Sequence, residues 1–490
     1  MNQHESIVTD RVGGFLDALR ASDLAPHITT DREAMAPWLT DWRGRFHGCA
    51  AAMLAPRSTE EAAWLVTKAA EHRVALVPQG GNSGMVGGAT PDADGAAVLL
   101  SMRRMNRIRI DLPDERAVIA EAGVILQTLH EHVADMDLRF PLTLGGKGSA
   151  TVGGLVSTNA GGTQVLRHGT MRALVAGIEA VLPNGSIHQG LEALKKDNRG
   201  YDLNHLLVGA EGTLGVVTAA RLRLSPAIID RTVAWAGVDS PEAARALLLF
   251  LEREAGAYME GFEIMPQHCI DNVVRHIPDT RAPLAVAHRW HCLIEIVRDD
   301  DADMASADRA ETVMAAAMQS GLIDDAVLSA SEAQAEAFWK IRDSIAEAER
   351  AAGPAVQHDI SVPVADMASF ISSISPEVEK RFPGTRAVAF GHMGDGNVHF
   401  HVLAPSGSDA ESWHAGPAHD ISHWVYDQVQ QWRGSISAEH GIGQLKRDEL
   451  ARLGDPARLY ALAAIKNALD PHNIMNPGKL IPLASSGDNS

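Results

Sequence analysis

Cysteine is scarce in this sequence: Cys49, Cys269 and Cys292 are the three among 490 residues. They are odd in number, far apart, and form no Cys-x-x-Cys pair, which argues against a disulfide framework or a zinc finger. A reducing cytoplasm is therefore the expected location. The N-terminus has no basic region followed by an apolar run, so we expect no signal peptide.

Long hydrophobic runs are also absent, and positive charge is in the minority. No apolar run approaches the roughly 18 residues that a bilayer span requires, so we expect no transmembrane segment. Lysine and arginine number 43 against 62 acidic residues, a net charge of -19. This balance argues against nucleic acid, whose binding depends on phosphate neutralisation, and against an anionic membrane surface. An anionic substrate would need local positive charge from Arg, Lys or a metal.

What is present is typical of a soluble globular protein, with 46% hydrophobic and 21% charged residues. A chain of this length predicts two or three domains. Histidine is concentrated in residues 391–401, Gly-His-Met-Gly-Asp-Gly-Asn-Val-His-Phe-His. The Asp-Gly pair in its middle is a strong signal for a two-residue hairpin loop. With that loop, His392 lies directly across from His399, with β-carbons about 5 Å apart, and His401 shares their face.

Two imidazoles placed in this way can close on one metal ion. Residues 435–443, Ser-Ile-Ser-Ala-Glu-His-Gly-Ile-Gly, add Glu439 as a third ligand and His440 as a candidate base. Two histidines and a carboxylate with open positions suit a catalytic metal site better than a closed structural one. The alternative is a hairpin that carries ordinary, hydrogen-bonded histidines. Three histidines on one face favour the metal.

Glycine is concentrated in three tracts of the first half, 78–88, 141–162 and 209–215. The first has five glycines in eleven residues, which excludes a helix or a central strand. Such loops let backbone N–H groups converge on an anion, although none is a Walker loop or a G-x-G-x-x-G turn. Between the tracts, an Asn-Gly pair at 184–185 predicts a hairpin. Three glycine loops in one α+β domain can wrap a long cofactor. The alternative, glycines that only form ordinary loops between strands and helices, accounts for one such tract more easily than for three.

Together with Lys196–Leu203 and Asn476-Pro477, these motifs resemble the FAD-binding flavoproteins of the vanillyl-alcohol oxidase and p-cresol methylhydroxylase (PCMH) superfamily. The second half resembles their FAD-linked D-2-hydroxy-acid dehydrogenase branch, of the D-2-hydroxyglutarate dehydrogenase-like kind. The resemblance implies an α+β fold with a two-part FAD-binding domain of the PCMH type, an α+β substrate (cap) domain and a C-terminal helical segment. The implied divisions are an N-terminal helix and arm at 1–45, the FAD domain at 46–226, the cap at 227–410, the helical segment at 411–484 and a disordered tail at 485–490.

The resemblance also implies roles for individual residues. His392, His399 and Glu439 match the ligands of a divalent metal, usually zinc, and His440 matches the catalytic base. Arg342 matches the residue that binds the substrate carboxylate. The hydroxyglutarate enzymes have a lysine and an asparagine at two substrate-contacting positions, where this chain is aligned with His358 and His401.

The implied FAD-binding positions lie along the three glycine tracts, with one more near the C-terminus. No His or Cys occurs from Val74 to Gly88, the region where some members of the superfamily tether flavin covalently, so non-covalent FAD is expected. The positions are Pro78, Gly80, Gly81, Asn82, Ser83, Gly84, Met85, Pro141, Thr143, Leu144, Gly145, Ser149, Gly153, Gly154, Ser157, Asn159, Glu211, Gly212, Gly215 and Asn476.

The implied reaction is the oxidation of a D-2-hydroxy acid, of the D-2-hydroxyglutarate, D-malate or D-lactate type, to its 2-oxo acid. Hydride passes to flavin N5, and the electrons pass to an acceptor such as electron-transfer flavoprotein or a quinone. A homodimer is compatible with the resemblance. We expect a small dicarboxylate to be preferred over D-lactate, because His358 and His401 would face the distal end of the substrate. The alternatives are a flavin oxidase that uses oxygen, a metal-dependent hydrolase and a non-catalytic flavin-binding subunit.

Overall fold

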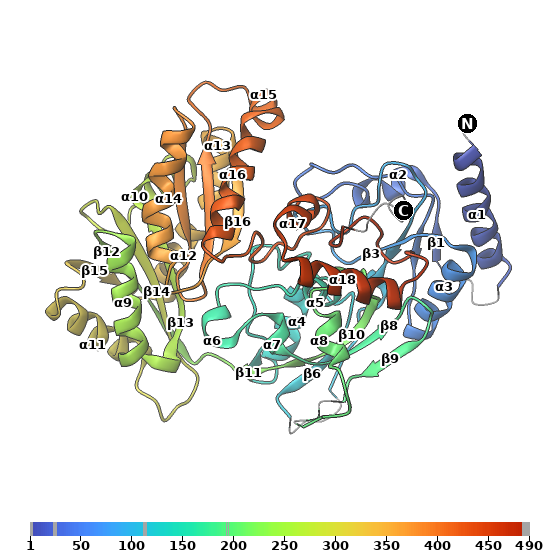
Figure 1. The fold of residues 1–490 in the computed structure, drawn as a ribbon. Helices are drawn as coiled ribbons and strands as arrows, with labels where there is room; N and C mark the ends of the chain where they lie inside the picture. Colours follow the sequence, from blue (N-terminus) through green and yellow to red (C-terminus); the bar gives the residue numbers. More distant parts are fainter. Residues whose placement is uncertain (1–2, 23–26, 111–114, 193, 195, 483–490) are drawn as a thin grey trace. The chain divides into compact units, whose positions relative to one another are not determined.

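The computed structural model describes residues 3–22, 27–110, 115–192, 194 and 196–482, and the expected disordered tail lies outside them (Figure 1). The chain divides into two compact units. The first contains residues 1–161, 169–225 and 439–490, and the second contains residues 162–168 and 226–438. The helical segment expected at 411–484 is thus shared between the two units. We describe each unit by itself.

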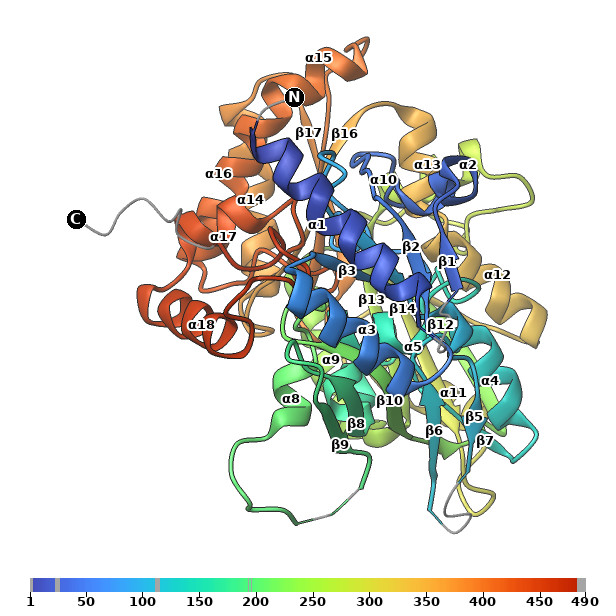
Figure 2. The same ribbon diagram turned by 90° about the vertical axis from the view of Figure 1, so that its right-hand side faces the viewer.

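The first unit contains a four-stranded sheet in the order β1-β2-β4-β3. β1 pairs antiparallel with β2, while β4 runs parallel to both β2 and β3. Helices α1 and α3 lie side by side (Figure 2), and their apolar residues share a core with β2, β3 and β4. The elements are α1 (Gln3–Arg20), β1 (His27–Thr29), α2 (Arg32–Met35), η1 (Ala36–Trp38), β2 (Met53–Ala55), α3 (Thr59–His72), β3 (Leu76–Gln79), β4 (Val98–Ser101) and η2 (Met102–Arg104).

A second sheet of the first unit has five strands in the order β5-β6-β10-β8-β9. The predicted hairpin at Asn184-Gly185 is confirmed, because β8 pairs antiparallel with β9 and Gly185 adopts a φ of 81°. Helices α4 and α5 contribute to the core beneath this sheet. The elements are β5 (Ile108–Arg109), β6 (Ala117–Glu121), α4 (Leu126–Ala134), β7 (Leu138–Arg139), α5 (Val152–Thr158), α7 (Met171–Leu174), β8 (Val175–Val181), β9 (Ile187–Gly190), α8 (Leu203–Leu207), β10 (Val216–Arg223), α17 (Arg447–Leu453) and α18 (Pro456–Leu469).

The second unit is built on a seven-stranded sheet in the order β15-β12-β14-β13-β17-β18-β16. Every neighbouring pair in it is antiparallel. The strands are β12 (Asp230–Val238), β13 (Met259–Pro266), β14 (Trp290–Arg298), β15 (Asp325–Leu328), β16 (Ala355–Ser361), β17 (Arg386–His392) and β18 (Asn397–Leu403). Along the chain, the division between the units falls within β11 (Ser225–Pro226).

Helices cover both faces of this sheet. On one face α10, α12 and α13 contact one another and enclose a core that includes Trp235, Phe338 and Phe390. On the other face α14 contacts α9 and α16. The helices are α6 (Val165–His168), α9 (Pro241–Glu254), η3 (Gly256–Tyr258), α10 (Gln267–His276), α11 (Ser306–Gln319), α12 (Glu332–Asp343), α13 (Ile345–Ala352), α14 (Met367–Arg381), α15 (Ala410–Ala415) and α16 (Pro417–Gln431). The expected α+β class is confirmed.

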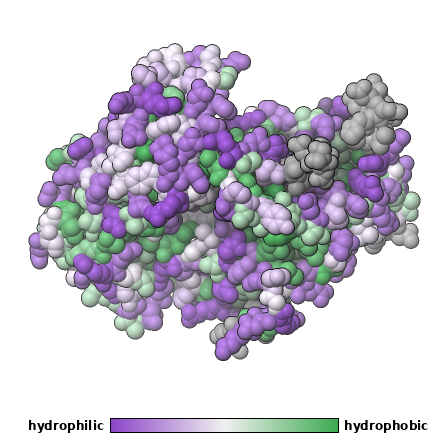
Figure 3. Space-filling model, in the orientation of Figure 1, coloured by the Kyte–Doolittle hydropathy of each residue, from purple (hydrophilic) through white to green (hydrophobic). Residues whose placement is uncertain are grey.

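None of the described helices is both long and apolar enough to cross a membrane. On the face drawn in Figure 3, hydrophilic side chains are spread over the surface and hydrophobic ones form smaller groups between them. This distribution agrees with the acidic, charged composition of the chain.

Candidate active site

The histidine hairpin forms, but its register differs from the predicted one. β17 and β18 pair His392 with Asn397 and Phe390 with His399. The prediction that His392 lies directly opposite His399 is therefore wrong. The turn has four residues instead of two, because the Asp395 carboxylate accepts a hydrogen bond from the Asn397 N–H at 2.9 Å and the Gly396 N–H donates to the His392 carbonyl at 3.2 Å.

The shift of two residues leaves both histidines on one face of the sheet, because side chains alternate with a period of two. The ring centroids of His392 and His399 are 5.5 Å apart, and a nitrogen of each ring lies within 4.8 Å of the other. The two imidazoles are thus diagonal neighbours instead of direct partners. The distance between their nitrogens suits two ligands of one metal ion.

A buried carboxylate that the sequence reasoning missed organises this pair. Glu263 on β13 pairs with His392 across the sheet and is 1% exposed. Its Oε1 accepts a hydrogen bond from His392 Nδ1, and its Oε2 accepts one from Arg342 Nε at 2.7 Å. Burial alone would raise the pKa of Glu263, but the charges and hydrogen bonds of Arg342 and His392 outweigh it and lower this pKa. The position of Glu263 among the apolar residues of β13 was the feature of the sequence that could have indicated its role.

The contact with Glu263 orients the ring of His392, and in the neutral form of the ring, with Nδ1–H donating, the lone pair lies on Nε2. This carboxylate–imidazole arrangement is the usual support of a metal-ligating histidine. Nε2 lies 3.3 Å from Arg342 Nη2. Burial, and next the charges of Arg342 and His392, lower the pKa of His399 well below its ordinary value. A neutral imidazole is the form that binds metals.

Two further polar residues line the same face beside the histidines. Asp359 on β16 pairs with His399, and its Oδ1 accepts a hydrogen bond from Asn397 Nδ2 at 3.0 Å. Among the described residues, the buried Oδ1 of Asn397 has no hydrogen-bond partner. Two imidazole nitrogens, nearby carboxylates and an unsatisfied amide oxygen are donors that a divalent cation accepts. The residues present therefore fit a metal, although the sequence did not predict Asp359 or Asn397 as site residues.

The two predicted substrate histidines are separated by the sheet. His401 pairs with Gln357 and lies on the face of His399, where its Nδ1 hydrogen-bonds the buried Glu349 carboxylate of α13. His358 is the neighbour of Gln357 in β16 and therefore points to the opposite face. There its ring nitrogens bond the Phe400 carbonyl at 2.8 Å and the Ser422 hydroxyl at 3.1 Å. The expectation that both histidines face one pocket is wrong, and Gln357 is the residue beside His401.

The predicted third ligand and base belong to the first unit. Ala438 is the last residue of the second unit, and its N–H donates to the Asp359 carbonyl of the same unit at 3.4 Å. Glu439, the next residue, begins the last segment of the first unit. A carboxylate oxygen of Glu439 and a ring nitrogen of His440 lie within 4.8 Å of each other. The loop continues to Gly443, whose N–H donates to Glu211 at 2.8 Å. His440 is thus carried by a segment that is fastened to the third glycine tract.

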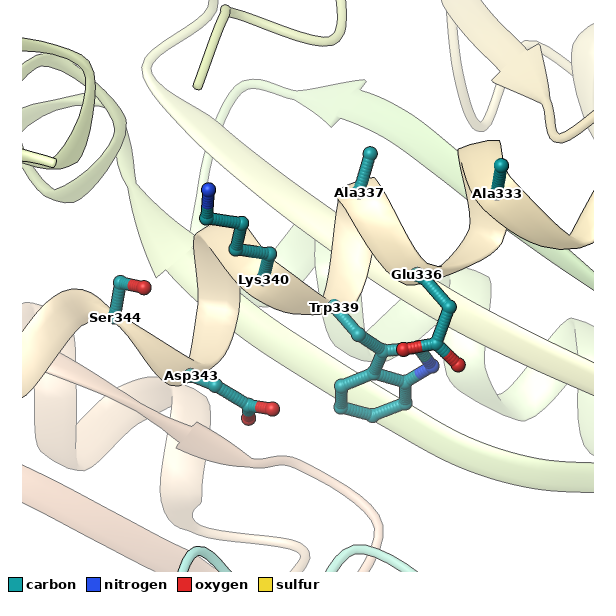
Figure 4. Close-up of a pocket in the computed structure, with 7 residues that line it drawn as sticks. All are labelled: Ala333, Glu336, Ala337, Trp339, Lys340, Asp343 and Ser344. Atoms are coloured by element: carbon teal, nitrogen blue, oxygen red, sulfur yellow. The ribbon is translucent and has the colours of Figure 1, made fainter. Parts of the chain in front are cut away.

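Helix α12, which carries Arg342, also borders a hollow of about 560 Å³ (Figure 4). The side chains of Glu336, Trp339 and Asp343 line it, together with Lys340. Figure 4 shows the Glu336 carboxylate near the Trp339 ring, on another side of the helix from Lys340. Two carboxylates against one ammonium make this hollow unfavourable for an anionic ligand. The sheet face that carries His392, His399 and His401, called the histidine face below, is the better candidate for the active site.

The expected flavin-binding positions all lie in the first unit, on the end of β3, on three loops, on α5 and on the C-terminal segment. The first two glycine tracts approach each other closely, since a Cβ on Gly81 would lie 1.7 Å from the Ser149 carbonyl oxygen. In contrast, a Cβ on Gly84 or Gly145 would meet no atom within 4 Å. Among the described residues, buried Thr151 Oγ1 and Asn476 Oδ1 lack partners. Closely packed backbones that border open space, with unsatisfied polar atoms nearby, fit the cradle of an extended cofactor.

Four of the predicted flavin-binding side chains form hydrogen bonds within the protein. Asn82 Nδ2 donates to the carbonyls of Pro37 and Thr40, and Asn159 Oδ1 accepts from the Arg172 N–H at 2.9 Å. Both carboxylate oxygens of Glu211 accept backbone N–H groups. Asn476 donates to the Gly88 carbonyl at 2.8 Å and to the Glu211 carbonyl at 2.7 Å, which joins the first and third tracts. These side chains shape the loops.

Two protein-family models match the chain. The FAD binding domain covers residues 50–190, and the C-terminal domain of FAD linked oxidases covers residues 229–480. Both models describe parts of FAD-dependent oxidoreductases. The chain is therefore an FAD-binding oxidoreductase, in agreement with the resemblance found in its sequence.

Individual relatives narrow this class. The chain is 33% identical over 456 residues to the mitochondrial D-2-hydroxyglutarate dehydrogenase of Arabidopsis thaliana, covering 93% of this chain and 79% of the relative. It is 33% identical over 457 residues to the D-2-hydroxyglutarate dehydrogenase of Xanthomonas citri pv. viticola, covering 93% and 94%. The chain belongs to the FAD-linked, D-2-hydroxyglutarate dehydrogenase-like family of D-2-hydroxy-acid dehydrogenases. The solved p-cresol methylhydroxylase shares the fold, with a TM-score of 0.71 at 14% identity over 99% of this chain and 98% of that one.

Proposed function

We propose that this protein oxidises a D-2-hydroxy acid to its 2-oxo acid and uses a divalent metal held by His392, His399 and Glu439. The observation that carries the metal proposal is the imidazole pair on one sheet face, with Glu263 orienting the ring of His392. Membership of the FAD-linked dehydrogenase family supports the redox chemistry. Zinc is the first metal to test, because two imidazoles and a carboxylate are an established catalytic zinc set.

FAD and a divalent metal would supply complementary chemistry. FAD, when bound, would serve as the acceptor of the hydride, with its two electrons, that leaves C2 of the substrate, and a divalent cation would lower the pKa of a coordinated hydroxyl. His440 takes the hydroxyl proton as general base. His440 directly follows the proposed metal ligand Glu439 in the sequence, which keeps the base close to the metal ligands. The glycine tracts of the first unit hold FAD without a covalent bond.

Arg342 binds the carboxylate next to the reacting carbon. Its Nε–H is committed to Glu263, which orients the guanidinium on the histidine face. A substrate carboxylate would take donors from the Nη nitrogens, in the planar geometry that guanidinium groups offer to carboxylates. The buried Glu263 thus supports both a metal ligand and the anion-binding residue.

The identity of the distal substrate group depends on Gln357 and His401. Relatives named for D-2-hydroxyglutarate make that acid the first one to test. His358 no longer supports a dicarboxylate, since its ring lies on the opposite face of the sheet. His401 is held by the Glu349 carboxylate, whose negative charge disfavours a distal carboxylate nearby. This contact favours D-lactate-type acids as the second candidate class.

Several finer assignments stay predictions. The acceptor is electron-transfer flavoprotein, a quinone or, for an oxidase, oxygen, and stopped-flow reoxidation of the reduced flavin separates the last from the others. A cytoplasmic location and a homodimer are likewise predictions. A metal-dependent hydrolase leaves the FAD-binding domain without a purpose, so we do not retain that alternative.

Anaerobic flavin bleaching tests the proposal directly. Metal-replete protein is mixed with D- and L-forms of 2-hydroxyglutarate, malate and lactate, and absorbance near the flavin maximum is followed. We expect at least one D-acid to bleach the flavin and its L-form to fail. Bleaching by none of these acids would instead favour a non-catalytic flavin-binding subunit.

A further inference from the structure

The carboxylate of Glu211 connects two segments that are 231 residues apart in sequence. Glu211 lies in the third glycine tract, is 8% exposed and adopts a φ of 50°. Its Oε1 accepts the Ile442 N–H at 2.7 Å, and its Oε2 accepts the Gly443 N–H at 2.8 Å. Both N–H groups belong to the loop that begins with His440.

The geometry of this loop is adapted to the carboxylate. Gly441 has a φ of 82°, and a Cβ there would lie 2.8 Å from Glu211 Oε1. A residue with a side chain would therefore have to displace the carboxylate. The loop is fastened on its other side as well, because Gln444 Nε2 donates to the Gly87 carbonyl at 2.8 Å and to the Thr90 carbonyl at 3.0 Å.

A buried carboxylate is stable only where hydrogen bonds replace its hydration. The two N–H groups of the His440 loop supply that replacement, so the loop and the acid depend on each other. The backbone of Glu211 is fixed independently, since its N–H donates to the Ser157 carbonyl at 2.8 Å and its carbonyl accepts from Asn476 Nδ2 at 2.7 Å. The side chain is thus directed from a rigid flavin-binding loop to the loop that carries the base.

We propose that Glu211 is a positioning residue that holds His440 in register with the flavin-binding loops, rather than a residue that binds FAD through its carboxylate. This inference rests on the proposed role of His440 as general base. The base must stay within hydrogen-bond reach of the substrate hydroxyl, and small displacements of reacting groups reduce rates strongly. The family resemblance placed Glu211 at the adenosine side of FAD and did not indicate this role.

The test uses the full-length, FAD-loaded and metal-replete protein with the acid that bleaches its flavin fastest. Glu211→Gln presents an NH₂ group to one of the two N–H donors and so breaks half of the contact. We expect retained FAD and metal, a KM close to wild type and a reductive rate lowered about 10–100-fold, as for other supporting hydrogen bonds in active sites. Glu61→Gln is the matched control, because Glu61 is a buried acid of the same unit that accepts the Arg57 N–H. It should leave the rate unchanged.

A double mutant separates positioning from general support of the fold. If Glu211 acts through His440, adding Glu211→Gln to His440→Ala should lower the reductive rate no further. Gly441→Ala attacks the same contact from the loop side and carries the test should Glu211→Gln fail to fold. We expect it to give the same pattern.

Three outcomes would overturn the inference. A wild-type reductive rate per bound flavin in Glu211→Gln would show that the contact is dispensable. Loss of FAD with a normal rate in the remaining holoenzyme would identify a cofactor contact instead. Additive losses in the double mutant would mean that Glu211 acts independently of His440. A wild-type rate in His440→Ala alone is a distinct result, which removes the base assignment itself and this inference with it.

Discussion

Lys466 on α18 is buried, with 2% of its surface exposed, and all three of its hydrogens are engaged. Its Nζ donates to Asp470 Oδ2 at 2.5 Å, to the Met475 carbonyl at 2.8 Å and to the Thr213 carbonyl at 2.9 Å. Asp470 in turn accepts the N–H groups of Ile474 and Met475. The pair therefore joins the third glycine tract to the segment that ends at Asn476, and we predict that Lys466→Met will destabilise the first unit.

The magnitude follows from these contacts. Burial lowers the pKa of Lys466, while the hydrogen bond and charge of Asp470 oppose that effect. Removing one member of a buried ion pair typically destabilises a protein by about 3–5 kcal/mol. Asp470 keeps two backbone donors after the substitution, so we expect the lower end, about 3 kcal/mol. That is a large share of the roughly 5–15 kcal/mol by which domains are stable.

Chemical unfolding of the FAD-free and FAD-loaded protein measures this change. The FAD-free variant should show the full loss, and its FAD dissociation constant should rise because Thr213 and Met475 lose their donor. Saturating FAD should restore part of the stability, by about 2.7 kcal/mol at a hundredfold excess over the dissociation constant. Lys68→Met is the matched control, because Lys68 forms a surface pair with Glu71 at 2.7 Å. Such pairs contribute about 0–1 kcal/mol.

A loss of stability in Lys466→Met no larger than that in Lys68→Met would contradict this prediction, because Asp470 and its backbone donors would then hold the segment without the ammonium. Unchanged FAD affinity alongside a large loss of stability would refute only the connection between the pair and the glycine tract.

Three further predictions concern the cofactor, the metal and the pH response. Acid precipitation should release the yellow colour into the supernatant, whereas colour in the pellet would indicate a covalent flavin. Chelation, or His392→Ala, should abolish turnover with FAD still bound, and full activity of metal-free protein would contradict the site. Burial and the neighbouring His288 lower the pKa of His291 to about 4, against about 6.5 unfolded. The unfolded chain takes the proton first, so stability is full above pH of about 6.5 and falls by about 3 kcal/mol towards pH 4. His291→Gln should flatten this dependence of the unfolding free energy, unlike the exposed His419→Gln; equal slopes in both would refute it.

The sequence predicted the face of the histidine cluster better than its register. Period-two alternation places His399 and His401 together whatever the turn length. His392 stayed on their face because the turn lengthened by two residues, an even number. A one-residue change would have moved it to the other side of the sheet. The Asp395 carboxylate stabilises the four-residue turn by accepting the Asn397 N–H. The general preference of Asp-Gly for two-residue turns does not take this hydrogen bond into account.

Other features depend on pairings that no local pattern encodes. Gln357 and His358 are neighbours, and only the register of β16 against β18 determines which of them shares a face with His401. Glu263 is 129 residues away from His392, so its role is visible only once β13 and β17 are adjacent. The glycine tracts were predictable because glycine content itself restricts the backbone. Their attachment through Lys466 and Asn476 was not, since those residues return from the far end of the chain.

The distribution of charge on the histidine face is one that the proposed metal ion would complement. Glu263, Asp359 and Glu349 are each less than 5% exposed and lie on or directly behind this face. Arg342 is the guanidinium bonded to one of them. Buried carboxylates are costly unless they are paired or coordinate metals. Arg342 and His392 contact Glu263, His401 contacts Glu349, and Asp359 accepts a hydrogen bond from Asn397. A divalent ion on the imidazole pair would add positive charge beside these carboxylates, and it would also raise the local potential that an anionic hydroxy acid needs in a chain of net charge -19.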